Sequence, residues 1–227
     1  MKTGSSLNQI MSSDSVKRSF RIRDYRDGDD AAAFYICMKT GDHGGDGEPL
    51  FRADPDALGR LYVAPYLRFE PELALFLEDD EGVCGYALGA RDSKEFYARY
   101  ESEMRPGLVA AFPDPDGEPA NWNRVEETYS FYHHPDYFLP QPYEQYPGHL
   151  HIDLLPRAQG GGWGRTMIEL LLERMRFLGL PGVHLGMSGV NHAAYGFYRH
   201  LGFVELSRTG EGEDESIYLG MKFKPQV

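Results

Sequence analysis

The sequence predicts an α/β fold, and three observations support this prediction. From residue 148 onward, apolar runs of strand length alternate with amphipathic segments of helix length, an order typical of α/β domains. The chain has 227 residues, which fits one large domain. Hydrophobic residues make up 41% and aromatic residues 13%, which is ample material for a packed core. This composition excludes a chain that is disordered throughout.

The first half of the chain supplies its predicted elements at wider spacing. Phe20, Ile22 and Tyr25 indicate a strand, and an alanine-rich stretch after it indicates a helix. Residues 41–47 are too rich in glycine for either regular structure, so they are predicted to form a mobile loop. The acidic turn at residues 79–82 joins two apolar runs as a hairpin. The predicted elements are a strand at 20–25, helices at 30–39, 54–61 and 93–104, and hairpin strands at 73–77 and 83–88.

Residues 105–147 mix prolines with aromatic residues. This mixture is too apolar for a linker, so we expect an ordered insertion that packs over the core. Two interpretations stay open: a structural cover only, or a cover that also forms one wall of a binding site. His133 and His134 lie in this segment, and His43 lies in the loop at residues 41–47. Each of them is either solvated or part of a pocket.

The second half of the chain is regular. Its predicted strands cover residues 149–155, 183–187, 203–207 and 217–223, and its helices cover 163–178 and 192–200. The helix at 163–178 has an apolar stripe at helical spacing, as expected for packing on a sheet. Gly179 and Pro181 end it.

The N-terminal residues, the cysteine count and the net charge indicate where the protein is located and which partners it binds. Residues 1–18 are polar and are expected to be a disordered or tag-like N-terminus, which leaves residues 19–227 as a single domain. Cys37 and Cys84 are too few for a disulfide framework or a zinc module, so a cytoplasmic location is the default. No apolar run approaches the roughly 20 residues that span a bilayer. The chain has 23 Lys and Arg against 35 Asp and Glu, a net charge of −12, so neither nucleic acid nor a membrane surface is an expected partner.

The most informative motif is the glycine-rich turn between the strand at 149–155 and the helix at 163–178. Glycines there allow backbone N–H groups to surround an anion, and the helix N-terminus adds partial positive charge. A P-loop is excluded because Arg165 and Thr166 follow the last glycine with the wrong spacing from Gly160. A dinucleotide-binding turn would follow the first strand, whereas this turn comes late in the chain.

What remains is Gln159-x-x-Gly162-x-Gly164, which resembles the acyl-CoA pyrophosphate loop of GNAT-superfamily N-acetyltransferases. Taken alone it could be a plain strand-to-helix turn. A second segment, about 30 residues later, resembles the other GNAT signature, N-x-x-A-x-x-F-Y-x-x-x-G-F. Its matching residues are Asn191, Ala194, Phe197, Tyr198, Gly202 and Phe203. The chain is therefore identified as a member of this superfamily.

Within the superfamily, the chain is similar to the C-terminal acetyltransferase-like domain of O-GlcNAcase and its free-standing bacterial relatives. The residues that carry this likeness lie at 149–155, 197–202 and 216–220. The resemblance implies a mixed, mostly antiparallel sheet with helices on both faces and a splay between strands four and five. It implies acetyl-CoA as co-substrate, with no metal, and it allows a homodimer.

The resemblance also implies roles for individual residues. The pyrophosphate would bind Gln159, Gly160, Gly161, Gly162, Trp163, Gly164 and Arg165. The backbone of Leu154 and Leu155 would bind pantetheine, with Asn191, Tyr195 and Tyr198 beside the cofactor. Tyr198 matches the family tyrosine that protonates the leaving thiolate, although an aromatic ring packed on the sheet is the plainer interpretation. The position that often carries a catalytic Glu falls near Gly148, so the usual base is absent.

Strand alternation places His149, His151 and Asp153 on one face. Three ionisable groups in a covered sheet are costly unless they line a cavity or pair with one another. Asp153 is the first choice for acceptor binding or general base, with His149 or His151 beside it. A paired structural cluster is the plain alternative, and the same spacing suits metal ligands.

We therefore expect an acetyl-CoA-dependent N-acetyltransferase that acts by direct transfer on a primary amine, either a small molecule or a protein. The first alternative is a protein that binds acetyl-CoA without catalysis, as a sensor or interaction module. The second is a His/Asp metalloprotein. The acidic residues Asp42, Asp46, Glu48 and Asp153 would favour a cationic acceptor.

Overall fold

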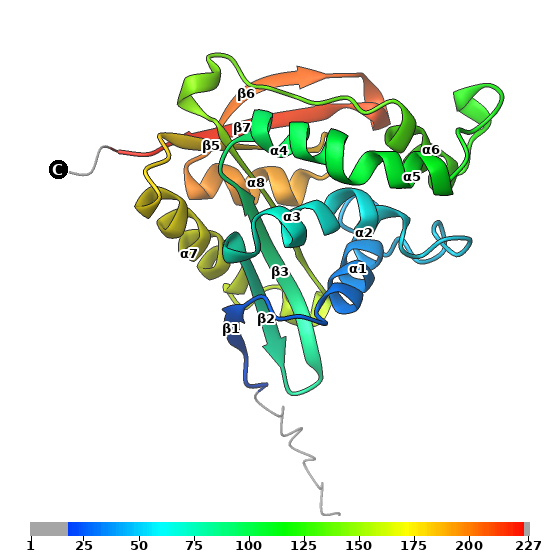
Figure 1. Ribbon diagram of the computed structural model, residues 1–227. Helices are drawn as coiled ribbons and strands as arrows, with labels where there is room; N and C mark the ends of the chain where they lie inside the picture. The colour runs from blue at the N-terminus through cyan, green and yellow to red at the C-terminus, as the bar shows by residue number, and fades with distance from the viewer. Residues whose placement is uncertain (1–17, 225–227) are drawn as a thin grey trace, which may run out of the picture.

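The computed structural model describes residues 18–224, and all but Arg18 of the predicted tag-like residues 1–18 lie outside this range. A seven-stranded sheet in the order β1-β2-β3-β4-β5-β7-β6 forms its centre (Figure 1). All neighbouring strands are antiparallel except β4 and β5, which are parallel. The strands are β1 (Arg21–Asp24), β2 (Ala74–Asp79), β3 (Gly82–Ala90), β4 (Gly148–Leu154), β5 (Gly182–Ser188), β6 (Val204–Thr209) and β7 (Ser216–Lys222). The predicted class, a mixed and mostly antiparallel sheet, is confirmed.

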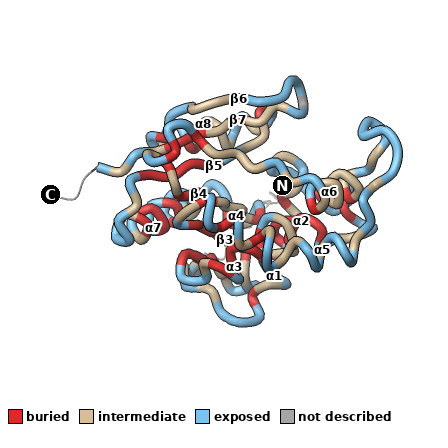
Figure 2. Tube along the Cα trace, turned by 45° about the horizontal axis from the view of Figure 1, so that its top comes forward, coloured by how far each residue is buried: buried red, intermediate tan, exposed pale blue. Residues whose placement is uncertain are grey.

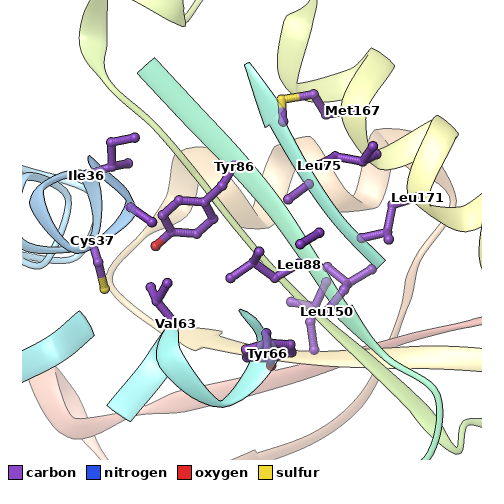
Figure 3. Close-up of a cluster of buried hydrophobic side chains, with 14 of the residues drawn as sticks. Ile36, Cys37, Val63, Tyr66, Leu75, Tyr86, Leu88, Leu150, Met167 and Leu171 are labelled. Atoms are coloured by element: carbon purple, nitrogen blue, oxygen red, sulfur yellow. The ribbon is translucent and has the colours of Figure 1, made fainter. Parts of the chain in front are cut away.

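Helices cover both faces of this sheet. Tyr86 and Leu88 of β3 point to the face that carries α1 and α3, while α7 packs its Met167 and Leu171 on the opposite face (Figure 3). The helices are α1 (Asp30–Lys39), α2 (Ala57–Tyr62), α3 (Ala64–Phe69), α4 (Ser93–Arg99), α5 (Arg105–Ala111), α6 (Arg124–His133), α7 (Trp163–Phe177) and α8 (His192–Leu201). Most residues of β3 and β5 are buried, whereas those of β6 are exposed or intermediate (Figure 2).

The strands β4 and β5 separate soon after they meet. Both are seven residues long, yet they pair only at Gly148 with Val183 and at His149 with His184. Beyond His149 the two strands diverge, so the backbone edge of each lacks a neighbour in the sheet. This is the splay that the sequence resemblance implied, and it opens the centre of the sheet to a ligand.

The turns of the hairpin and of α7 depend on glycine. Gly82 closes the β2–β3 turn at φ 110°, and Gly162 precedes α7 at φ 81°, both in the left-handed region that other residues rarely adopt. From Gly162 the chain turns directly into α7, whose apolar stripe is fully buried against the sheet. The glycine-rich turn therefore has a fixed position relative to β4.

One predicted boundary is wrong. The helix expected at 93–104 ends at Arg99, and a wider π-helical turn at Tyr100–Met104 leads directly into α5, so helical structure extends past the start of the expected insertion. Pro106 is tolerated there because it occupies the first turn of α5, where its missing N–H is not needed. Helix α3, which begins with Ala64-Pro65, was not predicted. Within residues 18–224, no helix has both the length and the apolar character to cross a bilayer.

Candidate functional site

A cavity of ≈ 790 Å³ opens where β4 and β5 separate. Its walls come from α1, α3 and α4, from the strands β4, β5 and β7, and from residues 131–138. His149, His151 and Asp153 all line it, as their shared strand face predicted. Tyr198 of α8 and His184 of β5 also line it. Titratable groups from distant parts of the chain therefore meet at the splay.

His149 is buried in this cavity as a neutral imidazole. The Ser93 hydroxyl donates to the Pro147 carbonyl at 2.8 Å, so it accepts the hydrogen of His149 Nδ1, which lies 2.7 Å away. This leaves Nε2 as the unprotonated nitrogen. Burial, and the nearby rings of His184 and His151, hold the pKa of His149 well below its usual value. Tyr97 stacks on the imidazole at 5.3 Å between centroids.

His184 is a second buried histidine, and the sequence analysis gave it no role. Its Nδ1 donates to the Tyr146 carbonyl at 2.9 Å, so its Nε2 is also unprotonated. Burial lowers its pKa. It sits opposite His149 in the last paired position before the splay, 5.8 Å away between ring centroids. A histidine inside an otherwise apolar strand was the signal that could have found it.

These two histidines predict a loss of stability in mild acid. Their lowered pKa values keep them neutral in the folded protein, while the unfolded chain takes up protons as the pH falls below about 6.5. The free energy of unfolding should fall by up to about 1.4 kcal/mol per group for each pH unit below that value. Urea denaturation at pH 7.5 and 5.5 measures this. His149→Asn should reduce the pH dependence, and His192→Asn, which removes an exposed histidine, should not; equal slopes in all three proteins would contradict the prediction.

His151 and Asp153 form a hydrogen-bonded cluster with Tyr86 of β3. The Tyr86 hydroxyl donates to Asp153 Oδ2, and His151 Nε2 lies 3.1 Å from both this hydroxyl and the same carboxylate oxygen. Because the Tyr86 hydroxyl gives its own hydrogen to Asp153, its oxygen accepts the hydrogen of His151 Nε2. Register places Tyr86 opposite Asp153. Tyr86, buried in an apolar segment of a hairpin strand, had no recognisable motif in the sequence.

The cluster bears on the metal interpretation. His149 does not join His151 and Asp153 as the strand spacing suggested; its Nδ1 is bonded to Ser93 instead. The thiol of Cys37 joins them, and one donor atom from each of Cys37, His151 and Asp153 lies within 4.8 Å of the others. Burial and the Asp153 charge raise the pKa of the Cys37 thiol, which disfavours the thiolate that a metal would bind. The absence of a metal stays a prediction.

Tyr198 is 7% exposed and faces the same cavity. Burial raises its pKa, and the negative charge of Asp153 raises it further, so the hydroxyl is protonated at neutral pH. The ring packs on Phe203. In the described part of the chain, its hydroxyl has no hydrogen-bonding partner. Tyr198 is thus a proton donor placed in the cavity, with no partner among residues 18–224.

The glycine-rich turn leaves its backbone amides free. The first backbone hydrogen bond of α7 runs from Thr166 N to Gly162 O at 3.1 Å, and the amides of residues 160–165 donate to no atom of the described residues. The space beside Gly160 and Gly162 is open. At Gly164, a Cβ would lie 3.1 Å from Leu154 and 3.6 Å from Phe197, so α7 approaches β4 and α8 closely. Free amides at a helix N-terminus form an anion site.

The predicted pantetheine contacts differ between the two leucines. The Leu155 amide donates to the Cys84 carbonyl of the neighbouring hairpin strand at 2.8 Å, so it points to β3, away from the splay. Strand alternation turns the backbone groups of Ile152 and Leu154 toward β5 instead. The side-chain amide of Gln159 donates a hydrogen bond to the Leu154 carbonyl at 2.8 Å. Ile152 thus replaces Leu155 as the backbone that faces the splay.

The remaining predicted residues separate into two groups. Asn191 lines the cavity; its side-chain oxygen caps α8 through the Ala194 amide at 3.0 Å. Tyr195 does not join it, because its hydroxyl binds Glu205 at 3.1 Å. Trp163 packs on Phe20 with ring centroids 5.3 Å apart, and Arg165 pairs with Glu169 at 2.8 Å.

The acidic residues of the loop near residues 42–48 do not line the cavity, although they were predicted to attract a cationic acceptor. Lys39 binds both Asp46 at 2.5 Å and Glu48 at 2.9 Å, so these carboxylates are already paired. Of the four acidic residues expected to attract a cation, only Asp153 lines the cavity. His43 does line it and reaches Ser188 of β5 at 2.8 Å, which ties the loop to the far side of the splay.

Gly148 explains why the usual base position carries no side chain. A Cβ there would lie 2.7 Å from Leu180, 2.9 Å from the Ala90 carbonyl and 3.0 Å from Met175. These neighbours lie on the α7 face, opposite to His149. A side chain at 148 would clash and would point away from the cavity, so any base that β4 supplies must come from its other face.

Residues 131–138 form one wall of the cavity. The Tyr137 ring stacks on Tyr97 of α4 at 4.3 Å, and Phe138 stacks on Tyr218 of β7 at 3.5 Å between centroids. The Tyr137 hydroxyl donates to Glu101 at 2.7 Å. This segment therefore has the second of its two predicted roles, as a wall as well as a cover. His133 and His134 do not line the cavity; they bind the Phe112 carbonyl and Asp114.

Comparison with known families identifies the fold. The sequence pattern of the acetyltransferase (GNAT) family matches residues 46–203. The crystal structure of SsHAT superposes with a TM-score of 0.80 at 37% sequence identity, covering 90% of this chain and 98% of that one. The structure of YncA from Salmonella typhimurium, a putative acetyltransferase with its cofactor acetyl-CoA, superposes with a TM-score of 0.52 at 16% identity and shares the fold.

Curated relatives include O-GlcNAcase. The proteins from Rattus norvegicus and Mus musculus are each 25% identical to this chain over 206 residues. The match covers 90% of this chain but only 22% of the length of those proteins. Both likenesses expected from the motifs, to the GNAT superfamily and to O-GlcNAcase, are confirmed.

Proposed function

Because the chain belongs to the acetyltransferase (GNAT) family, we propose that it transfers the acetyl group of acetyl-CoA directly to a primary amine bound in the cavity. One observation carries this proposal. Strand β4, which separates from β5 after His149, carries His151 and Asp153 into the cavity that Tyr198 also lines, and then leads into the turn of free amides before α7. An anion-binding turn that directly follows a strand with proton-transfer groups suits a phosphate-bearing acyl donor.

The residues present fit acetyl-CoA. The amides of residues 160–165 would hold its pyrophosphate, since they are free and lie at the positive end of α7. The backbone of Ile152 and Leu154 would hold its pantetheine arm at the splay. When bound, acetyl-CoA supplies an activated acyl group and a thiolate leaving group. This local field needs no basic surface, which reconciles a phosphate-bearing substrate with a net charge of −12.

Asp153 is the proposed acceptor-side base. Its carboxylate attracts an ammonium group and accepts the proton that this group loses before its nitrogen attacks the acetyl carbonyl carbon; the second proton leaves the nitrogen as the amide forms and passes to His149 Nε2 or to water. Tyr86 holds the carboxylate in place through its hydrogen bond, and His151 Nε2 lies 3.1 Å from the same carboxylate oxygen. His149 keeps an unprotonated nitrogen nearby as a second acceptor.

Tyr198 is the proposed acid. As the carbon–sulfur bond breaks, its hydroxyl donates a proton to the leaving sulfur, and the proton that leaves the nitrogen as the amide forms balances the exchange. Its raised pKa keeps that proton in place until the thiolate forms. A backbone amide of β4 at the splay is positioned to polarise the acetyl carbonyl. These assignments need no side chain at position 148.

The Gly162→Asp variant tests the anion site at the glycine-rich turn. An aspartate before α7 would cap its free amides with a carboxylate and add a negative charge, so it should compete with the pyrophosphate. Acetyl-CoA affinity, measured by calorimetry, is expected to fall at least about 10-fold. Gly117→Asp is the control, because it adds the same charge at a positive φ of 86° in open space away from the turn. Equal affinity in the two variants would remove the turn from the binding site.

A further inference from the structure

The chemistry of the cavity wall is unusual in two respects. Ten aromatic side chains line it: Tyr62, Tyr66, Phe96, Tyr97, Tyr100, Phe131, Tyr137, Phe138, Tyr198 and Tyr218. Among the residues described, those that line it include the carboxylates Asp136, Asp153 and Asp214 but neither lysine nor arginine. The neutral forms of His149 and His184 add no positive charge. The wall is therefore rich in aromatic rings and carries carboxylates without lysine or arginine among its described residues.

We infer that the acceptor is a small primary amine with an aromatic body and no anionic group, of the arylalkylamine class. This inference rests on the proposed function and names the substrate of the same site. A buried carboxylate or phosphate on the acceptor would need a lysine or arginine partner, which the described lining does not offer. Amino acids and sugar phosphates are thus disfavoured, whereas an ammonium group finds both carboxylates and aromatic faces.

The arrangement of the rings favours a flat guest. The Tyr97–Tyr137 and Phe138–Tyr218 stacks have interplanar angles of 14° and 12°, so four rings present ordered faces and edges around the opening. The Tyr66 ring lies 5.3 Å from His149, edge to face. Aromatic pairs of this kind are worth about 0.5–1.5 kcal/mol beyond the area that they bury. An aliphatic amine would forgo that contribution.

The size of the cavity favours a small molecule over a protein side chain. A volume of ≈ 790 Å³ lies within the range of small-molecule sites. A lysine side chain is a thin, flexible chain that would leave most of the aromatic surface without contact. Acetylation of a lysine-containing peptide is therefore an outcome that would count against this inference.

Matched pairs of acceptors test the inference. Phenethylamine and phenylalanine share the same ring and amine but differ in the α-carboxylate, as do tyramine and tyrosine. Calorimetric titration of each into the protein saturated with CoA measures acceptor binding without turnover. We expect phenethylamine and tyramine to bind about 100-fold more tightly than their amino acids, and more tightly than butylamine. Phenylalanine binding as tightly as phenethylamine, or a lysine peptide or butylamine binding more tightly, would overturn the inference.

Variants of the wall give a second measurement. Tyr137→Ala removes a ring of the stack and should weaken phenethylamine binding at least about 10-fold, while Tyr137→Phe keeps the ring and should retain it. Failure of the proposed function is read separately, from acetyl-CoA binding and thiol release. Turnover of acidic or aliphatic amines would overturn the acceptor class alone. Tight phenethylamine binding without any thiol release would overturn catalysis but keep the acceptor class.

Discussion

The Tyr198→Phe variant is expected to lose about 10²- to 10⁴-fold in kcat, the usual contribution of a positioned general acid. The hydroxyl faces the cavity with a pKa raised by burial and by Asp153, so it holds a proton for the leaving sulfur. Phenylalanine keeps the ring that packs on Phe203 and removes only that proton. Acetyl-CoA affinity should therefore change little while kcat falls.

Tyr195→Phe is the matched control for this variant. Tyr195 lies one turn away on the same helix, but its hydroxyl binds Glu205 outside the cavity. Its loss should leave kcat within about threefold of the unmodified protein. Thiol release at saturating acetyl-CoA, together with calorimetric affinity, separates chemistry from binding. A Tyr198→Phe protein with unchanged kcat would return Tyr198 to a packing role.

The Asp153→Asn variant is expected to lose about 10²- to 10³-fold in kcat/KM for a primary amine at pH 7. Asparagine has nearly the same shape, so it can still contact Tyr86 and His151, but it neither attracts an ammonium group nor accepts its proton. The loss in kcat/KM should become smaller as the pH rises toward the pKa of the amine, because more of the acceptor is then already in its neutral, unprotonated form. That pH dependence distinguishes a base from a residue that only supports the fold.

Asp136→Asn provides the comparison for Asp153→Asn. Asp136 also lines the cavity. Of the two aspartates, only Asp153 accepts the hydrogen bond of Tyr86 and lies beside His151. The Asp136 variant should affect KM for a cationic amine modestly and leave kcat and its pH profile unchanged. If both variants behave alike, Asp153 contributes only to the general negative charge of the cavity.

Local patterns in the sequence predicted those parts of the site that depend on neighbours along the chain. Alternation placed His149, His151 and Asp153 on one strand face, and the glycines before α7 marked the turn with free amides. Both features follow from periodicity and from backbone conformations that few residues adopt. The seven-stranded mixed sheet was also within reach, because the two motifs identify the family that has it.

Features that depend on pairing across the sheet could not be predicted in the same way. Tyr86 meets Asp153 only through the β3–β4 register, and His184 meets His149 only through the short β4–β5 pairing. Alternation shows which face a residue takes but not which residue lies opposite, and it left the direction of the Leu155 amide open. Tyr195 stands at a position that the motif leaves open, and its hydroxyl binds Glu205 outside the cavity. The cytoplasmic location, the homodimer and the absence of a metal stay predictions.

The central claim is direct acetyl transfer from acetyl-CoA to an amine at the splay. Initial rates with acetyl-CoA and phenethylamine varied together, and with the product identified by mass spectrometry, test it most directly. The account predicts intersecting double-reciprocal lines and one acetylated amine for each thiol released. Acetyl-CoA that binds without acetylating any amine in a panel of aromatic, aliphatic and peptide acceptors would contradict it, and would instead support a protein that binds acetyl-CoA as a sensor or interaction module.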